Sequence, residues 1–497
     1  MSTVGSKRTF PRSRKQSGDP ARLFAVALAL GVVSCKRSPP APPPAPPEPS
    51  AAPSTSAAPA PAAPVPRCHV LEGSAGLHLT LGPRAPVAAP LPGTGASTED
   101  GDGDDDVALP YSPEIGVGAA LGSDAFAVSA LLPEKGSTSA VVGVLSRRLP
   151  QGKIIDLSKI HGDVSPPRVA ASGKNLILAI PDGAPNGTLV RVARVDDWAG
   201  SAHLTWGADV SQGNDESEAL ALEVGSKTAV LAWDDWNARD GQEVVKIVTF
   251  SPGDVSKLSA PLVLSSPNED AEGPLLSPRA GGFWAAWMAR DAHAKHAGAA
   301  PAPSGKNEPA AGDTPEAVDT TPRWLMLVPL DEAGKPASAP LRVTPKDAHV
   351  QGFDLAPAKD GGALVAFRDD RAIEGTSGGT VRLVVVRADG TVDARTVSDE
   401  DVGPAVPSLL VDGASDFALP GWLALTSDSG AARLLALDPQ GRGLDVLAAE
   451  ASAGTSTLLA VRGKEILATR PRGKGVEAFV LTCEKGAPGE LENAKPF

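Results

Sequence analysis

Residues 352–397 read GFDLAPAKDGGALVAFRDDRAIEGTSGGTVRLVVVRADGTVDARTV, and this stretch decides the fold. The segment 361–370 opens on two glycines, continues apolar and ends on two aspartates, whereas 380–390 is rich in β-branched residues and ends on Asp-Gly. Asp-Gly supplies the positive φ angles of a tight hairpin turn, and 391–397 alternates apolar and polar residues as a half-buried strand does. With the apolar 353–356 in front, the stretch predicts four short strands.

Two markers of this unit recur along the chain. The first is a second strand that ends near an alanine, and its copies are AFAVSA (125–130), LILAIPD (176–182), AVLAWDD (229–235), WAAWMARD (284–291), LVAFRDD (364–370), WLALTSD (422–428) and EILATR (465–470). The second is a turn glycine after the third strand, found at Gly152, Gly200, Gly253, Gly334, Gly390, Gly441 and Gly486. These glycines are 48, 53, 81, 56, 51 and 45 residues apart, and the long interval holds an Ala/Pro/Gly-rich insertion at about 292–322. Two markers with one spacing predict seven related units.

A four-stranded unit of about 50 residues that is repeated in this way resembles the β-propellers as a class. The predicted fold class is therefore all-β, a propeller with seven four-stranded blades, in which ring closure removes the exposed strand edges. No signature of a named propeller family is present. Six or eight blades, or a tandem of β-sandwiches, are the alternatives.

The N-terminus predicts export. Six basic residues precede the apolar segment LFAVALALGVV (23–33), which at 11 residues is too short to span a bilayer but suits a signal peptide. It ends in Val-Val-Ser-Cys at 32–35, which resembles the lipobox of bacterial lipoproteins. The resemblance implies that residues 1–34 are a signal peptide and that Cys35 is lipidated. A plain secretory signal is the alternative. If the source is a Gram-negative bacterium, Lys36, in place of an aspartate, implies by the same resemblance an outer-membrane lipoprotein that faces the periplasm or the cell surface.

The next segment predicts a spacer. Residues 35–67 are rich in proline and alanine, so they cannot bury a core and favour extended polyproline II. At ~3.1 Å per residue, about 30 residues could hold a domain roughly 90 Å from its anchor. The predicted propeller spans 68–486, with a disordered insertion at about 292–322 and an acidic loop at 97–106, and 487–497 form a C-terminal tail.

Two cysteines remain, one at each end of the predicted propeller. Cys68 opens the first strand-like stretch after the spacer, and Cys483 lies where the last unit places the end of its third strand. Propellers commonly close by letting an N-terminal strand complete the last blade, which would bring Cys68 beside Cys483. Because exported compartments permit disulfides, we expect the two to be bonded. Two unpaired thiols are the alternative.

Signatures of catalysis and metal binding are scarce. There is no Gly-rich phosphate loop, no HExxH and no GxSxG, and the acidic run 99–106 lacks the glutamate that completes an EF-hand loop. His293 and His296 lie near Asp291, but in the insertion. The sequence therefore predicts no metal site and no cofactor.

Charge and aromatic residues indicate where a partner could bind. The net charge is −13, and becomes −18 when the first 34 residues, with six basic residues and one aspartate, are removed, which argues against nucleic acid. The loops that join strands two and three share one propeller face with the blade-to-blade loops, and they carry many acidic residues, whereas the opposite turns carry lysine and arginine. Most tryptophans are expected in the core. The candidate binding residues on the acidic face are Asp234, Asp235, Asp369, Asp370 and Trp236.

The sequence thus favours a lipid-anchored envelope propeller that acts as a binding or scaffold module. Its expected partners are the membrane, through the lipid, and a cationic protein, a divalent ion or a polysaccharide on the acidic face. One alternative is a carbohydrate-active enzyme that uses the two Asp-Asp pairs as acid and base. The other is a structural envelope protein. A non-enzymatic role is favoured because adjacent aspartates more often mark the end of a strand.

Overall fold

The computed structural model describes much of the second of two compact units, Pro61–Phe497. The described residues are 66–71, 77–79, 113–134, 137–146, 149–185, 187–211, 219–237, 241–292, 321–358, 361–370, 379–398, 406–411, 421–426, 432–437, 443–446, 457–472 and 475–485. The predicted signal peptide, Cys35, the spacer up to residue 65, the acidic loop 97–106, most of the insertion and the tail lie outside them.

The described residues form seven antiparallel sheets, which we number in chain order. Sheet 1 has β3 (Glu114–Leu121), β4 (Ala125–Glu134), β5 (Ser137–Ser146) and β6 (Leu149–Ile160); sheet 2 has β7 (Arg168–Ser172), β8 (Asn175–Ala184), β9 (Gly187–Asp196) and β10 (His203–Asp209). Sheet 3 has β11 (Leu220–Val224), β12 (Ala229–Asn237), β13 (Gln242–Ser251) and β14 (Asp254–Leu258), with β15 (Leu262–Val263) added on β13; sheet 4 has β16 (Glu269–Arg279), β17 (Gly282–Asp291), β18 (Trp324–Asp331) and β19 (Leu341–Arg342).

The remaining sheets repeat this order. Sheet 5 has β20 (Val350–Pro357), β21 (Ala363–Asp369), β22 (Thr380–Val386) and β23 (Val392–Ser398); sheet 6 has β24 (Ser408–Leu410), β25 (Gly421–Thr426), β26 (Ala432–Leu437) and β27 (Gly443–Val446). Sheet 7 has β28 (Thr457–Arg462), β29 (Glu465–Arg472), β30 (Gly475–Lys485) and β1 (Pro66–Val70), with β2 (Leu77–Leu79) also on β30. None of the described residues is helical, so no helix among them could cross a membrane.

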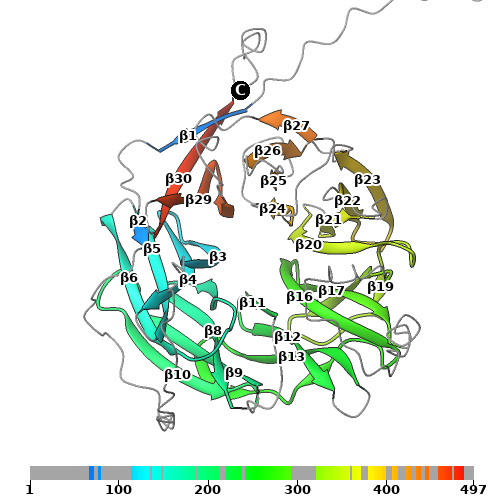
Figure 1. Cartoon of the computed structure of the whole chain (residues 1–497), viewed down its shortest axis with the longest axis horizontal. Coiled ribbons are helices and arrows are strands. Elements are labelled where there is room, and N and C mark those ends of the chain that lie inside the picture. Colours follow the sequence, from blue (N-terminus) through cyan, green and yellow to red (C-terminus); the bar gives the residue numbers. More distant parts are fainter. Residues whose placement is uncertain are drawn as a thin grey trace, which may run out of the picture. The chain divides into compact units, whose positions relative to one another are not determined.

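The sheets form a closed ring through their first strands. In sequence order, β3, β7, β11, β16, β20, β24 and β28 each contact the next, and β28 contacts β3. Figure 1 shows the first strands nearest the centre and the fourth strands at the periphery. This arrangement is a β-propeller, and the prediction of an all-β propeller is confirmed.

The unit at 352–397 has the four strands that its sequence predicts. Its apolar segments form β20, β21, β22 and β23, paired in that order. The Asp-Gly turn joins β22 to β23, and Gly390 has a φ of 85°, which a residue with a side chain rarely adopts. The other copies of the second-strand marker likewise form the second strands β4, β8, β12, β17, β25 and β29.

Ring closure uses strands from both ends of the described chain. β1 pairs antiparallel with β30, and Cys68 lies directly opposite Cys483 in that register. β2 pairs with the other end of β30, and its Leu77 and Leu79 are buried among side chains of sheets 1 and 7. The expectation that an N-terminal strand completes the last sheet beside its third strand is confirmed.

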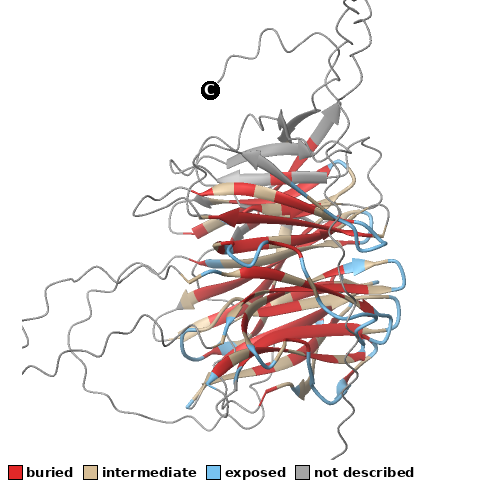
Figure 2. Ribbon diagram, turned by 90° about the vertical axis from the view of Figure 1, so that its right-hand side faces the viewer, coloured by how far each residue is buried: buried red, intermediate tan, exposed pale blue. Residues whose placement is uncertain are grey.

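Hydrophobic clusters between neighbouring sheets supply the core. Figure 2 shows buried residues along the strands and exposed residues gathered at turns. Most predicted core tryptophans belong to these clusters: Trp233 lies between sheets 2 and 3, Trp287 and Trp324 between sheets 3 and 4, and Trp284 between sheets 4 and 5. The tryptophans therefore pack blade against blade, as expected of large apolar side chains.

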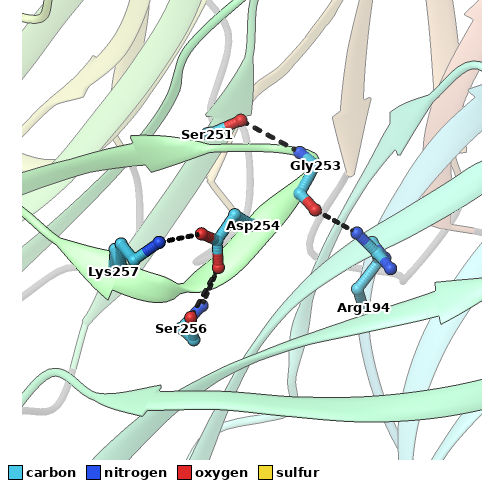
Figure 3. Close-up of polar contacts among 6 residues, drawn as sticks. All are labelled: Arg194, Ser251, Gly253, Asp254, Ser256 and Lys257. Atoms are coloured by element: carbon cyan, nitrogen blue, oxygen red, sulfur yellow. Dashed lines mark hydrogen bonds and ion pairs between the residues drawn. The ribbon is translucent and has the colours of Figure 1, made fainter.

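Polar contacts at turns also join neighbouring sheets. Arg194 on β9 donates through Nη1 to the carbonyl oxygen of Gly253, in the turn between β13 and β14 (Figure 3). In the same turn, the Asp254 carboxylate accepts hydrogen bonds from the Ser256 hydroxyl at 2.5 Å and the Lys257 ammonium at 3.0 Å. These donors, Ser256 first, lower the pKa of Asp254 to about 2. The hydrogen bond from Arg194 to Gly253, one of the predicted turn glycines, thus joins sheet 2 to sheet 3.

Candidate functional site

The first strands enclose a central cavity of about 570 Å³, within the size range of small-molecule sites. All seven first strands contribute to it. Much of the wall is apolar, and its members include Ala170, Leu222, Leu276, Phe353, Leu410 and Leu459. Three charged residues interrupt this wall: Arg168, Glu223 and Asp354.

Arg168 and Asp354 lie at the same level of the ring. Arg168 is opposite Ala179 on β8, and Asp354 is opposite Ala366 on β21. Both alanines occupy the marker position of their second strands, three residues before an aspartate. The two charges therefore face the cavity from sheets 2 and 5 at equal depth. Each favours the charged form of the other through space.

Asp354 joins sheet 5 to sheet 6. Its Oδ2 accepts a hydrogen bond from the Leu409 amide of β24 at 2.6 Å, and its Oδ1 accepts one from the Leu355 amide at 2.8 Å. Burial nevertheless raises the pKa of Asp354 to about 6, although the two amides and Arg168 oppose that rise. Asp354 is thus both a ring contact and a negative group in the cavity.

Glu223 is the second acid of the cavity and lies deeper toward the turns that join first and second strands. It is opposite Val230, two residues before the marker Ala232. Its Oε1 accepts a hydrogen bond from the Val224 amide at 3.1 Å. Burial raises the pKa of Glu223 to about 7, because an apolar surrounding disfavours the charged carboxylate. This group can therefore change charge near neutral pH.

Arg168 is the cation among the charged residues that line the cavity. Its Nε is buried and has no hydrogen-bond partner among the described residues. Burial is the main cause that lowers the pKa of Arg168, and the charge of Asp354 opposes this.

The predicted Asp234–Asp235 pair does not reach this cavity. Asp234 is buried and accepts hydrogen bonds from the amides of Ala219 and Gly273, each at 2.9 Å. Asp235 is also buried and forms an ion pair with Lys246. Adjacent strand residues point to opposite faces of a sheet, so the two carboxylates have different partners: Asp234 contacts β16 of sheet 4, and Asp235 pairs with Lys246 within sheet 3.

The second predicted pair is engaged in the same way. The Asp369 carboxylate is buried, accepts a hydrogen bond from the His349 amide at 3.3 Å and lies 3.1 Å from Nε of Arg382. Asp370 lies 2.7 Å from Nε of Arg368. Neither residue lines the cavity. The structure does not bring the two pairs into one cavity, and each is used within its own part of the ring.

Trp236 has the exposure that its position predicts. Its side chain is 40% exposed at the end of β12, whereas Trp233 on the same strand is buried. It does not line the cavity. Among the predicted acidic-face residues, Trp236 is the one that presents a large surface to solvent.

Sequence reasoning missed the three cavity residues. A visible signal was a charged residue inside an otherwise apolar first strand, as in LALEV (220–224) and FDLA (353–356). That signal does not show which strand faces a shared cavity, because the cavity exists only once the ring is closed. Within the described residues, no group of three or more His, Cys, Asp or Glu is placed to hold a metal ion.

Comparisons with known proteins identify no family for this chain. No family model and no curated protein matches the chain. Solved structures that resemble it include the GH93 α-L-arabinofuranosidase of Fusarium graminearum, at 13% identity, 74% of this chain, 93% of that chain and a TM-score of 0.39. Two others are the polysaccharide lyase Uly1 (10% identity, 76% and 91%, TM-score 0.45) and the β-propeller domain of the Trilobed protease from Pyrococcus furiosus (9%, 77% and 98%, TM-score 0.42). At these identities and TM-scores the likenesses carry no argument about function.

Proposed function

We propose that the protein is a seven-bladed propeller that acts as a binding module and takes a small ligand in its central cavity. The observation that carries this proposal is Arg168, whose buried Nε lacks a hydrogen-bond partner among the described residues, in a cavity with two carboxyl groups. A buried donor without an acceptor is costly, and a ligand that supplies an acceptor would remove that cost. The acidic pairs named from the sequence are less suitable, since backbone amides or basic side chains already engage them.

A cavity-filling variant tests this proposal. Ser408 lines the cavity and is half-buried, so Ser408→Phe should occupy space that a ligand needs. The full chain, purified from its natural envelope, would be analysed by mass spectrometry for co-purifying small molecules. We expect at least one compound to be enriched and to fall at least tenfold in Ser408→Phe.

Ser226→Phe, on the exposed turn before β12, is the matched control and should retain the compound. Equal compound profiles for the wild type and Ser408→Phe, with both variants folded, would contradict binding in the cavity.

The proposed location rests on the sequence. We propose that Cys35 is lipidated, that 36–67 act as a spacer and that the propeller faces the periplasm or the cell surface from the outer membrane. Labelling with an alkyne fatty acid should mark the wild type, and Cys35→Ser should lose both the label and partition into detergent. A labelled Cys35→Ser protein would exclude this anchor. A cationic protein, divalent ion or polysaccharide on the acidic face stays a prediction, with Trp236 as its exposed contact.

A carbohydrate-active enzyme is a second candidate, favoured by one observation. Glu223 and Asp354 are two carboxyl groups in one cavity, with pKa values raised to about 7 and about 6. Raised values of this kind are typical of general acids. If the protein cleaves polysaccharides, Glu223→Gln should lower sugar release roughly 10²–10⁴-fold. No release by the wild type from a broad polysaccharide panel would reject this candidate and leave the binding proposal intact.

A further inference from the structure

The cavity residues define a ligand class, and this inference rests on the proposed function. We propose that the central cavity binds a small zwitterion, an organic molecule whose carboxylate meets Arg168 and whose ammonium group meets Glu223.

Arg168 calls for an anion. Its Nε has no hydrogen-bond partner among the described residues, and Asp354, which favours its charged form through space, accepts the amides of Leu355 and Leu409. A guanidinium presents a planar fork of donors that matches a carboxylate with two parallel hydrogen bonds. A ligand carboxylate is therefore the group that completes the surroundings of Arg168.

Glu223 calls for a cation. One of its oxygens accepts the Val224 amide, and a carboxylate has capacity for further donors. Glu223 comes from β11, the first strand of the sheet next to that of Arg168. In marker register it lies two residues further along the strand axis, roughly 7 Å. The two complementary groups of a ligand must therefore be separated.

The charges of the site disfavour a dianion. Arg168, Glu223 and Asp354 sum to −1 when all are ionised, so a phosphate or sulfate would meet two acids for each cation. A zwitterion adds no net charge and matches both signs. Leu222, Leu276 and Leu459 along the wall suit a hydrocarbon body between the two charged ends.

The test compares matched probes of increasing reach. Glycine, 4-aminobutanoate and 6-aminohexanoate carry both groups at three separations, whereas hexanoate and hexylamine each carry one. Binding to the purified full chain would be measured by ligand-observed NMR and calorimetry. We expect one of the amino acids to bind at least tenfold more tightly than either single-charge probe.

Substitutions show which side chain binds which end of the ligand. Arg168→Met should reduce the affinity for the best-binding amino acid at least tenfold and leave the affinity for hexylamine unchanged. Glu223→Gln should reduce the affinity for the same amino acid at least tenfold and leave the affinity for hexanoate unchanged. Lys174→Met, on the exposed β7–β8 turn of the same sheet as Arg168, is the control and should change nothing. Thermal denaturation of each variant would show that it is folded.

The outcomes separate this inference from the function on which it rests. If the single-charge probes bind as tightly as the amino acids, if no probe binds, or if folded Arg168→Met keeps full affinity, the zwitterion class is wrong. If an envelope compound is still lost in Ser408→Phe, cavity binding stands with another ligand class. If Ser408→Phe changes neither the envelope compounds nor probe binding, both proposals fail.

Discussion

At the scale of single residues, the ring places two carboxyl groups where burial raises their pKa values. Glu223 and Asp354 are only half-buried by their surface, yet apolar walls and limited water around them raise both pKa values. Asp254, on an exposed turn, has its pKa lowered instead by its hydrogen-bond donors. Aspartate therefore differs in pKa between the cavity and the periphery.

The raised pKa of Glu223 predicts a pH-dependent cost. Between its ordinary value of 4.5 and about 7, the unfolded chain has lost this proton while the folded chain keeps it. The folded state therefore loses stability as pH rises through this window, on the order of 1–3 kcal/mol. We expect Glu223→Gln to match the wild type at pH 4 and to be more stable at pH 8, measured by denaturant unfolding.

Glu332→Gln, on the exposed turn between β18 and β19, is the control and should follow the wild type at both pH values. If Glu223→Gln and the wild type keep a constant difference from pH 4 to pH 8, Glu223 titrates at its ordinary pKa.

At the scale of elements, aspartates near the ends of second strands bind the backbone of the chain where it leads into sheets 2, 3 and 5. Asp182 accepts the amide of His161, Asp234 that of Ala219 and Asp369 that of His349. Ala219 and His349 directly precede the first strands of sheets 3 and 5, and His161 lies in the segment between β6 and β7. Several aspartates that the sequence assigns to an acidic face therefore form internal hydrogen bonds with the backbone.

Removing one such carboxylate should cost stability. Asp234→Ala leaves the amides of Ala219 and Gly273 without their acceptor, and each unsatisfied buried donor costs about 1–3 kcal/mol. We expect the free energy of unfolding to fall by about 2–4 kcal/mol, measured by denaturant titration. Asp254→Asn, on an exposed turn, should change it little. A fall of equal size in both variants would mean that the anchoring position has no special role.

The strands could be predicted because their sequence signals, the apolar–polar alternation and the turn residues, lie close together in the chain. Alternation, β-branched residues and Asp-Gly or single-glycine turns lie within ten residues of each other, so 352–397 contains all the information for β20 to β23. The role of Asp234 could not be read in this way, because its partner Gly273 lies on another sheet. The alternation itself, however, already separates Asp234 from Asp235, since neighbours on a strand face opposite sides.

At the scale of the whole molecule, the ring creates features that no single unit contains. Each sheet buries its faces against two neighbours, and the cavity appears only where all seven first strands meet. A repeat can be found from spacing, but the depth of Arg168 relative to Glu223 depends on how separate sheets align. This is why the fold could be predicted and the cavity residues could not.

Closure of the ring gives the last prediction. Residues directly opposite in an antiparallel pair have Cα atoms about 4.5–5.5 Å apart, within the range of about 4.4–6.8 Å that a disulfide requires. Cys68 and Cys483 are such a pair, and a bond between them would enclose nearly the whole ring. Because it restricts the unfolded chain, it should stabilise the fold by a few kcal/mol.

We therefore expect non-reducing peptide mapping to find Cys68 bonded to Cys483, and the double variant Cys68→Ser/Cys483→Ser to unfold at lower denaturant concentration. Reductant should lower the wild type to the level of the double variant and leave that variant unchanged, which separates loss of the bond from loss of the thiols. Two free thiols in the exported protein would leave β1 and β2 held to β30 by strand pairing and side-chain packing alone. The ring would then open first at β1, and hydrogen exchange at β30 would be as fast in the wild type as in the variant.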